Sequence, residues 1–582
     1  MITKVYLALL ILLFSPSYLL VAAADTPKTK AKVAFSGPHQ IAVDTSTSLS
    51  AWLFTRDNKP KPVILAFTPY SPQALAERAV FFAEHDYVFL IVSSRGRGDS
   101  GGTFQPFSAI DGLDAASVIQ WAATQPWSDG QVAMWGGSYV GYSQWAALSH
   151  LPDALKTIVP AAAVFPGIDY PAYNNIRFNY SFQWLEAMQG RGDWFNMAFR
   201  EDVWAEQVQH LRKAGQATAS LAALTGSNSA IAEQWLEQPL LDNFWQQTVP
   251  SGTALQQVRL PVLTITGYFD ADQRGAVAHH QRYVSAGAQQ RLQATLLIGP
   301  WDHSGTRSPS RTQAGIAVEE GSVLDMNALH LSWYNWVLKQ QAQPVSLRSG
   351  IHYFLMGANE WRHLELMPAA NVGWHLHPAP GANFTTALPG LLSPEQAPAT
   401  TFSYEFDPQQ AALTNPVQFS QLANEQRDIR VLDGDGLVFV SEPFPHSIEL
   451  VGMPKLTLQL SVDAVDADIY VLVEELLANG ETLRLSYDMQ RLRHLTGLDK
   501  NVLLQPGKLY PIIFDSFTFI ARRLAAGSRL RLSLHSNPPL YLEHNYSGPS
   551  AVSSQIATNP GTVTVKMVQT AEQPNILWLP LQ

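Results

Sequence analysis

The stretch that most constrains this chain is 131–145, which reads QVAMWGGSYVGYSQW. A short apolar run breaks at two glycines, presents Ser138 and continues in helical rhythm, which predicts a strand, a sharp turn and a helix with the serine at the apex. The N–H of Tyr139 then begins a helix and can face a developing oxyanion. The usual Gly-x-Ser-x-Gly pattern places its second glycine at position 140, whereas this chain has Val140 and Gly141. Alone, the motif is an imperfect nucleophile elbow.

The residues before the elbow predict an α/β fold. Two continuous apolar runs, 63–68 and 87–92, are typical of strands buried on both faces of a mostly parallel sheet. Helical patterns follow them over 74–85 and 111–124. Strand, helix, strand, helix and strand, with a serine at the end of the last strand, is the order of an α/β-hydrolase.

The middle of the chain predicts a cap inserted into this domain. Further buried strands are expected at 262–266 and 294–298, whereas 166–255 carries aromatic-rich amphipathic helical patterns. A helical insertion at this point lies over the strand ends. We therefore expect a catalytic domain over 33–165 and 256–342, with a helical cap at 166–255 between the two parts.

The last part of the chain has a different pattern. Short alternating strands spaced by turns predict an antiparallel β-sandwich over 346–582. Within it, residues 378–401 are rich in Pro, Ala, Gly and Thr and are expected to form loops.

The N-terminus has the layout of a secretory signal peptide over 1–24. Lys4 precedes an almost wholly apolar stretch at 5–14, and three alanines at 22–24 form a small-residue cleavage site. An uncleaved anchor is the alternative, because apolar residues continue through 19–21. We expect cleavage, no stable membrane insertion afterwards, and a periplasmic or secreted protein.

Composition narrows the classes of protein further. The chain has 582 residues, a formal net charge of -10 and no long basic run, which argues against nucleic acid as the main partner. It has 0 Cys, so an exported form must be stable through packing alone, without disulfides or thiolate-metal bonds.

Two side chains complete a catalytic triad with Ser138. A serine hydroxyl needs a histidine base, and the imidazole needs an acid, which an α/β-hydrolase supplies in the order Ser, acid, His after later strands. Asp270 follows the strand at 262–266, and His303 follows the strand at 294–298. The alternatives are a helix N-cap for Asp270 and a surface-loop histidine paired with Asp302 for His303.

The oxyanion needs a second donor, and Tyr70 stands in the loop that supplies it. A phenol can donate to a developing oxyanion, although Tyr70 can equally pack against the prolines at 69 and 72. A metallohydrolase using His279 and His280, or Asp302 and His303, lacks a third ligand at suitable spacing. We expect no metal and no cofactor.

Several segments together resemble the CocE/NonD hydrolases, a family that includes cocaine esterase, α-amino-acid ester hydrolases and X-Pro dipeptidyl-peptidases. The segments are TPYSP, SSRGRGDSGGTF, QPWSDGQVAMWGGSYVGYSQW, GYFD and GPWDHS. The family's elbow reads Gly-x-Ser-Tyr-x-Gly, which this chain matches. The resemblance implies Ser138 as nucleophile, Asp270 and His303 as its partners, and the Tyr70 hydroxyl and Tyr139 amide as oxyanion donors. It also implies a C-terminal jelly-roll sandwich.

The resemblance leaves the substrate open. In α-amino-acid ester hydrolases, carboxylates just after the triad aspartate help to bind the substrate ammonium. This chain has Asp272, but Gln273 stands at the place of the second acid. Asp193 in the cap is another candidate acid, with a helix N-cap as its alternative role. An acidic pair favours a cationic amino group, and without the pair a neutral acyl ester is the default substrate.

These observations predict an exported serine hydrolase that cleaves a small ester or a short peptide through an acyl-enzyme on Ser138. Substrates with an α-amino-acyl group or an X-Pro amide remain within this prediction. The alternative from another class is a catalytically silent binding or scaffold protein that uses its β-sandwich. Intact Ser, Asp and His at three separate sites count against that alternative.

Overall fold

The computed structural model describes residues 32–190, 201–378, 389–409, 436–558 and 561–582. The predicted signal peptide at 1–24 and the candidate Asp193 lie outside these ranges. Across the described ranges, none of the helices combines the length and the apolar character needed to cross a membrane.

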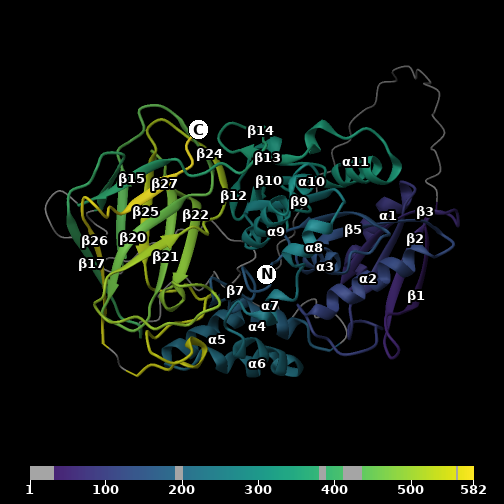
Figure 1. Cartoon of the computed structure of the whole chain (residues 1–582), viewed down its shortest axis with the longest axis horizontal. Coiled ribbons are helices and arrows are strands. Elements are labelled where there is room, and N and C mark those ends of the chain that lie inside the picture. The colour runs from purple at the N-terminus through teal and green to yellow at the C-terminus, as the bar shows by residue number, and fades with distance from the viewer. Residues whose placement is uncertain (1–31, 191–200, 379–388, 410–435, 559–560) are drawn as a thin grey trace, which may run out of the picture. The chain divides into compact units, whose positions relative to one another are not determined.

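The first part of the chain forms an α/β-hydrolase sheet, as predicted (Figure 1). Its order is β1-β2-β4-β3-β5-β6-β9-β10-β13-β14, with a parallel central part and antiparallel strands at both edges. The strands are β1 (Ala34–Ala42), β2 (Ser48–Thr55), β3 (Lys61–Thr68), β4 (Val88–Ser93), β5 (Ser128–Gly137), β6 (Leu155–Ala161), β9 (Val262–Phe269), β10 (Ala294–Asp302), β13 (Gly350–Leu355) and β14 (Glu360–Leu364).

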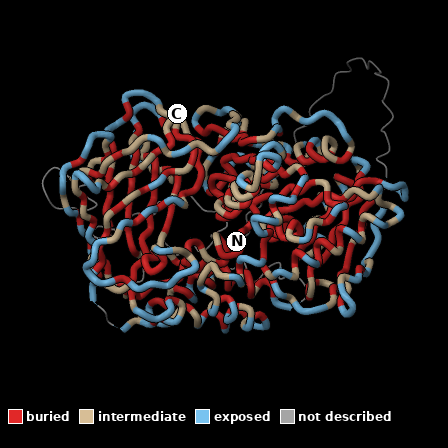
Figure 2. Tube along the Cα trace, in the orientation of Figure 1, coloured by how far each residue is buried: buried red, intermediate tan, exposed pale blue. Residues whose placement is uncertain are grey.

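Helices cover both faces of this sheet because its central strands are apolar on both sides. In β3, Val63 and Leu65 belong to the core on one face, which also contains residues of α2, α3 and α9. Ile64 and Ala66 belong to the core on the other face, with residues of α1 and α11. Figure 2 shows these strands as buried. The helices are α1 (Ala76–Glu84), α2 (Ala109–Ala123), α3 (Tyr139–Ala147), α9 (Gln273–Ser285) and α11 (Met326–Lys339).

The segment between β6 and β9 contains the predicted helices and, in addition, a short hairpin. Helices α4, α5 and α6 lie near one another (Figure 1). Their aromatic residues pack together; for example, the ring centroids of Trp184 and Trp235 are 6.3 Å apart. The elements are β7 (Ala172–Tyr173), β8 (Ile176–Arg177), α4 (Tyr180–Ala187), α5 (Glu201–Lys213), α6 (Ser229–Glu237), α7 (Asn243–Gln246) and α8 (Gly252–Gln257).

The C-terminal part is the predicted β-sandwich. Strands β17 and β18 are far apart in its sheet order, yet the rings of Phe402 and Phe439 lie 5.3 Å apart, so the sheet folds over one apolar core. Its strands are β15 (Val372–His377), β16 (Gly390–Ser393), β17 (Thr400–Phe406), β18 (Gly436–Ser441), β20 (Lys455–Val462), β21 (Asp468–Leu476), β22 (Thr482–Arg491), β23 (Tyr510–Phe514), β25 (Arg529–His535), β26 (Val563–Gln569) and β27 (Ile576–Leu579), with β19 (Ile448–Gly452) paired to β24 (Ile520–Leu524) alongside.

Two predictions for this part need correction. The start of the sandwich at 346 is wrong for β13 and β14, because β13 pairs in parallel with β10 and extends the first sheet. The loop prediction for 378–401 is wrong for β16 and for the beginning of β17. The first error arises because a short alternating pattern identifies a strand but does not identify its neighbour. The second arises because a composition typical of loops predicts no strand where tertiary pairing forms one.

Candidate active site

The predicted elbow is present at the end of β5. Ser138 separates β5 from α3 and has φ 61° and ψ −126°, a sparsely populated conformation for a residue other than glycine. Its N–H donates to the carbonyl oxygens of Ala161 and Ala162 at 2.9 and 3.0 Å. The turn is therefore anchored on the end of β6, and the serine stands between strand and helix.

The glycines around Ser138 are required by close packing. A Cβ on Gly136 would lie 2.2 Å from Val140 Cγ1, and a Cβ on Gly141 would lie 2.8 Å from the Ala161 carbonyl oxygen. Helix α3 thus crosses β6 at Gly141, while the Val140 side chain occupies the space over Gly136. This arrangement is the physical reason for the glycine that stands one place later than in the usual motif.

Asp270 and His303 meet as the strand-end placement predicts. His303 Nδ1 lies 2.9 Å from Asp270 Oδ1, and both side chains are buried. Asp270 Oδ1 also accepts from the N–H of Asp272 at 3.1 Å, and its Oδ2 accepts from Thr266 Oγ1 at 3.0 Å. These contacts fix the carboxylate beside Nδ1 of His303, which favours the tautomer with its proton on Nδ1 and leaves Nε2 without one.

Asp302 has a different role from the surface pairing considered for it. Its carboxylate accepts from the backbone N–H groups of Gly305 and Ala314 at 2.8 and 3.1 Å. These bonds close the turn that follows His303 and hold the imidazole in place.

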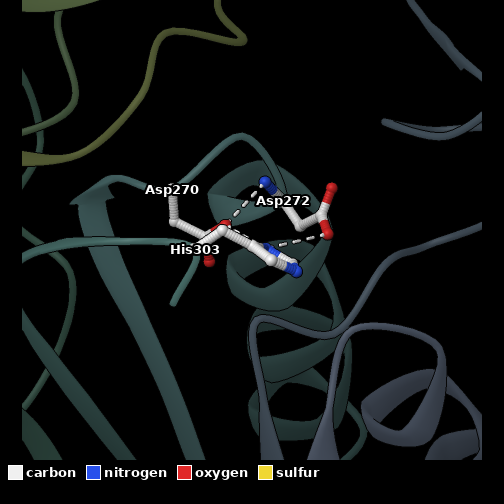
Figure 3. A group of neighbouring side chains, drawn as sticks. All are labelled: Asp270, Asp272 and His303. Atoms are coloured by element: carbon white, nitrogen blue, oxygen red, sulfur yellow. Dashed lines mark hydrogen bonds and ion pairs between the residues drawn. The ribbon is translucent and has the colours of Figure 1, made fainter. Parts of the chain in front are cut away.

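Asp272 is close to the triad, whereas Gln273 is not available to the site. Asp272 Oδ2 lies 3.5 Å from His303 Nδ1, so both carboxylates approach the same ring nitrogen (Figure 3). Burial, together with Asp270 and Asp169, raises the pKa of Asp272, and Arg307 opposes this shift. Gln273 Nε2 donates to the carbonyls of Gly267 and Phe519 at 3.1 and 3.0 Å, which binds α9 to the β-sandwich.

Tyr70 lies beside Ser138. Its hydroxyl interacts with the side chain of Ser138 and accepts from Trp184 Nε1 at 3.2 Å. Burial raises the pKa of Tyr70, while its hydrogen bonds and the charge of Arg307 act in the opposite direction. The phenol therefore stays protonated, and because Trp184 supplies the donor to its oxygen, its own O–H is available to an oxyanion.

The backbone N–H and the side chain of Tyr139 lie in different environments. Its N–H is the first of α3, and the first four N–H groups of a helix have no intrahelical partner. Its hydroxyl donates to Asp111 Oδ2 at 2.8 Å, away from the nucleophile. The position of the Tyr139 amide is compatible with the predicted oxyanion role, which stays a prediction, and the ring packs with Phe107 at 4.7 Å between centroids.

The histidines considered for a metal site are part of the packing. The His279 ring stacks between Trp145 and Phe165, and burial lowers its pKa to about 3. In the part of the chain that the structure describes, the three side chains whose ligand atoms all lie within 4.8 Å are Asp270, Asp272 and His303. These belong to the triad region, and the 2.9 Å contact between His303 and Asp270 has the length of a hydrogen bond.

Three residues near the elbow were not found from the sequence. Trp184 bonds Tyr70, and buried Gln144 donates to the carbonyl of Gly136 at 3.0 Å. Arg307 packs on Gly137, where a Cβ would lie 2.1 Å from its Nη1. Gln144 lies within the elbow stretch itself and Arg307 lies shortly after His303, whereas no motif or strand end marks Trp184.

Comparison with known proteins agrees with this geometry. The family model for X-Pro dipeptidyl-peptidase (S15 family) matches residues 47–305, and the one for the X-Pro dipeptidyl-peptidase C-terminal non-catalytic domain matches residues 339–574. Cocaine esterase from Rhodococcus sp. (strain MB1 Bresler) is 24% identical over 556 residues, which cover 90% of this chain and 94% of the relative. The chain belongs to the CocE/NonD hydrolase family.

Solved structures show the same fold over the whole CocE/NonD chain. An α-amino acid ester hydrolase superposes with a TM-score of 0.82 at 20% identity, covering 97% of this chain and 98% of that one. A CocE/NonD family hydrolase from Staphylococcus aureus superposes with a TM-score of 0.67 at 14% identity, with coverage of 97% and 98%. The CocE/NonD chain is therefore a serine hydrolase, of the esterase or peptidase kind.

Proposed function

We propose that this CocE/NonD chain hydrolyses acyl esters or amides through an acyl-enzyme on Ser138, with His303 as general base and Asp270 as the acid that orients it. The observation that carries the proposal is the 2.9 Å contact between His303 and Asp270, which come from the ends of neighbouring strands in the sheet that presents Ser138.

The chemistry has two steps. His303 Nε2 takes the proton of Ser138 Oγ as that oxygen attacks the carbonyl carbon, and the oxyanion accepts from the Tyr139 N–H and the Tyr70 O–H. The imidazolium, stabilised by Asp270, then gives the proton to the leaving oxygen or nitrogen. In the second step, His303 takes a proton from water, which attacks the acyl carbon and releases the acid and free Ser138.

Acyl esters are the substrates that we propose first. An ammonium site for α-amino esters or X-Pro amides would rest on Asp272, and Asp193 as a second acid remains a prediction. Asp272 is 3% exposed and lies beside both His303 and the cationic Arg307, so a second cation has little room or attraction there. The α-amino-acyl class is kept as the second candidate, because the carboxylate lies next to the triad.

We also propose that the enzyme is exported to the periplasm or secreted. The charge, apolar stretch and small-residue site at the N-terminus support this, and the 0 Cys composition is compatible with it. A small ester or short peptide is the expected partner, and the net charge of -10 argues against nucleic acid.

A substrate panel tests the catalytic proposal. Purified wild type and Ser138→Ala are compared on simple acyl esters, α-amino esters and X-Pro amides, with thermal stability measured in parallel. Ser138→Ala is expected to lose turnover while it keeps its melting temperature; residual activity above a few per cent contradicts the nucleophile assignment. The same panel is run on Asp272→Asn. If Asp272 binds the substrate ammonium, this variant should bind α-amino substrates more weakly than wild type does and should bind neutral acyl esters equally well.

A catalytically silent scaffold is the remaining alternative. It predicts that no member of the panel is turned over by wild type, and that a known serine hydrolase is active under the same conditions.

A further inference from the structure

Arg307 lies against the elbow at the residue that precedes the nucleophile. Its Nη1 is 2.1 Å from the position of a Cβ on Gly137, and its Cδ is 2.9 Å from the same position. Because successive Cα atoms are about 3.8 Å apart, the guanidinium lies within about one residue of Ser138. The backbone of Arg307 is held by its N–H bond to Ser304 at 3.1 Å and by a bond from Arg78 at 3.3 Å.

The guanidinium has no hydrogen-bond acceptor among the described residues. Nη1 is buried without a partner, and no described side chain or carbonyl accepts from Nε or Nη2. Arg307 as a residue is of intermediate exposure, so part of its side chain reaches the surface. An unpaired guanidinium in a partly buried place is costly and needs a reason.

Other buried arginines of this protein have acceptors for their guanidinium N–H groups. Arg212 donates to the carbonyls of Pro538, Pro539 and Leu542 at 2.7–3.0 Å. Arg491 bonds Asp468 through two nitrogens at 2.8–2.9 Å and also reaches Glu543 at 2.6 Å. Arg307 differs from both, because its buried Nη1 has no acceptor.

The acids near Arg307 are engaged elsewhere. Its charge interacts with Asp270, Asp272 and Asp302, and with Tyr70. Both oxygens of Asp270 accept hydrogen bonds within the triad, and both oxygens of Asp302 accept from backbone N–H groups. Burial lowers the pKa of Arg307 and these acids oppose that shift, but none lies within 4.0 Å of it as an ion pair in the described chain.

We propose that Arg307 binds a carboxylate carried by the substrate, so that the preferred substrates are esters or amides with an anionic group close to the scissile carbonyl. This inference rests on the proposed acyl transfer by Ser138 and specifies its substrate class. Arginine presents parallel N–H donors that match the two oxygens of a carboxylate. A substrate carboxylate would give the guanidinium the acceptor that the protein does not provide, and would place the scissile carbonyl next to Ser138 and Tyr70.

The test compares matched substrates on three proteins. The mono-p-nitrophenyl ester of adipic acid carries a free carboxylate. In its matched partner that carboxylate is a methyl ester and the p-nitrophenyl ester is kept, so the partner is neutral and has the same leaving group. A second pair, meta-acetoxybenzoate and its methyl ester, places the charge on the leaving group instead. Wild type, Arg307→Met and Arg307→Lys are assayed on both pairs. Arg311→Gln is the control, since Arg311 is a 62% exposed arginine of the same loop.

Wild type is expected to prefer the anionic member of at least one pair. Arg307→Met should lower kcat/KM for that member roughly 10–100-fold more than for its neutral partner. Arg307→Lys should keep part of the preference, and Arg311→Gln all of it. Equal values for both members in wild type, or an equal loss for both in Arg307→Met, would overturn the proposal.

Two further measurements keep the result interpretable. A fluorophosphonate probe that fails to label wild type contradicts acyl transfer by Ser138, whereas labelling without a preference for anionic esters contradicts only the role of Arg307. If Arg307→Met does not fold, inhibition of wild type by adipate against dimethyl adipate serves instead. Competitive inhibition by the dianion alone supports the proposal, and equal or absent inhibition contradicts it.

Discussion

Gly136 lies so close to Val140 that a Cβ at position 136 would be 2.2 Å from Val140 Cγ1 and 2.7 Å from its Cβ. Gly136 also has φ 140°, which side-chain-bearing residues rarely adopt. The shape of the elbow around Ser138 therefore depends on the contact between Gly136 at the end of β5 and Val140 in the first turn of α3.

Replacing Gly136 with alanine is expected to destabilise the protein and distort the elbow. Strain at φ and overpacking against Val140 each cost about 1–3 kcal/mol, so we expect a lower melting temperature together with a lower kcat. Gly130→Ala is the control, because Gly130 has φ 89° but nothing within 4 Å of its Cβ position. If Gly136→Ala is as mild as Gly130→Ala, the packing account of the elbow is wrong.

The two carboxylates beside His303 are expected to contribute unequally. Asp270 accepts the short bond at 2.9 Å, whereas Asp272 lies at 3.5 Å from the same nitrogen. Asp270→Asn should lower kcat roughly 10³–10⁴-fold because it no longer holds the required tautomer, and Asp272→Asn should lower it less than about tenfold on neutral esters. Steady-state kinetics of both variants, with a chelator present, tests this prediction. A larger loss of kcat in Asp272→Asn than in Asp270→Asn would show that Asp272 is the acid that orients His303.

Removal of the Tyr70 hydroxyl should slow acylation by roughly 10²–10³-fold, since it removes one of two oxyanion donors. Trp184→Phe is the matched variant, because it removes the 3.2 Å bond to the Tyr70 oxygen and keeps both the Tyr70 hydroxyl and an aromatic ring at position 184. We expect that variant to lose less activity than Tyr70→Phe in a pre-steady-state assay. A wild-type acylation rate in Tyr70→Phe would refute the donor role.

Asp111 should make stability depend on pH in the direction opposite to that of a salt-bridged carboxylate. Burial raises the pKa of Asp111 from 3.8 to about 7, so the folded state binds its proton more tightly than the unfolded state. Its contribution to the free energy of unfolding is therefore greatest below about pH 4 and falls as the pH rises towards about 7. One pKa unit corresponds to about 1.4 kcal/mol, which gives roughly 4 kcal/mol over this window.

Asp111→Asn isolates this contribution. Asp111 Oδ2 accepts from the hydroxyls of Tyr139 and Tyr142 and from the N–H of Ser108, and an amide oxygen keeps all three bonds. The melting temperature of the variant relative to wild type should thus rise between about pH 5 and about pH 8. A difference that does not change with pH would show that Asp111 is not titrated in this range.

The catalytic constellation could be predicted because it follows local rules. Ser138, Asp270 and His303 each come directly after an apolar run, and parallel strands bring their carboxyl ends to one edge of the sheet. The assignment of the two oxyanion donors rests on the same placement and on the resemblance to the family, and it stays a prediction.

The residues that support the constellation could not be predicted in this way. Trp184 meets Tyr70 across 114 positions, and Arg307 meets Gly137 across a still larger separation, so no spacing in the sequence marks either contact. The same limit explains β13 and β14, whose alternating pattern resembled a sandwich strand although their partner was β10. Tertiary contacts determine which residues and strands become neighbours, and the local sequence pattern does not show these contacts.

The central claim is that Ser138 is the nucleophile, activated by His303. Its most direct test is mass spectrometry of the proteolytic peptide that contains Ser138 after the intact protein reacts with a fluorophosphonate. We predict one adduct, on Ser138, that is absent in Ser138→Ala and much slower to form in His303→Gln. An unlabelled Ser138 in protein that remains folded, beside a known serine hydrolase that labels, would contradict the account.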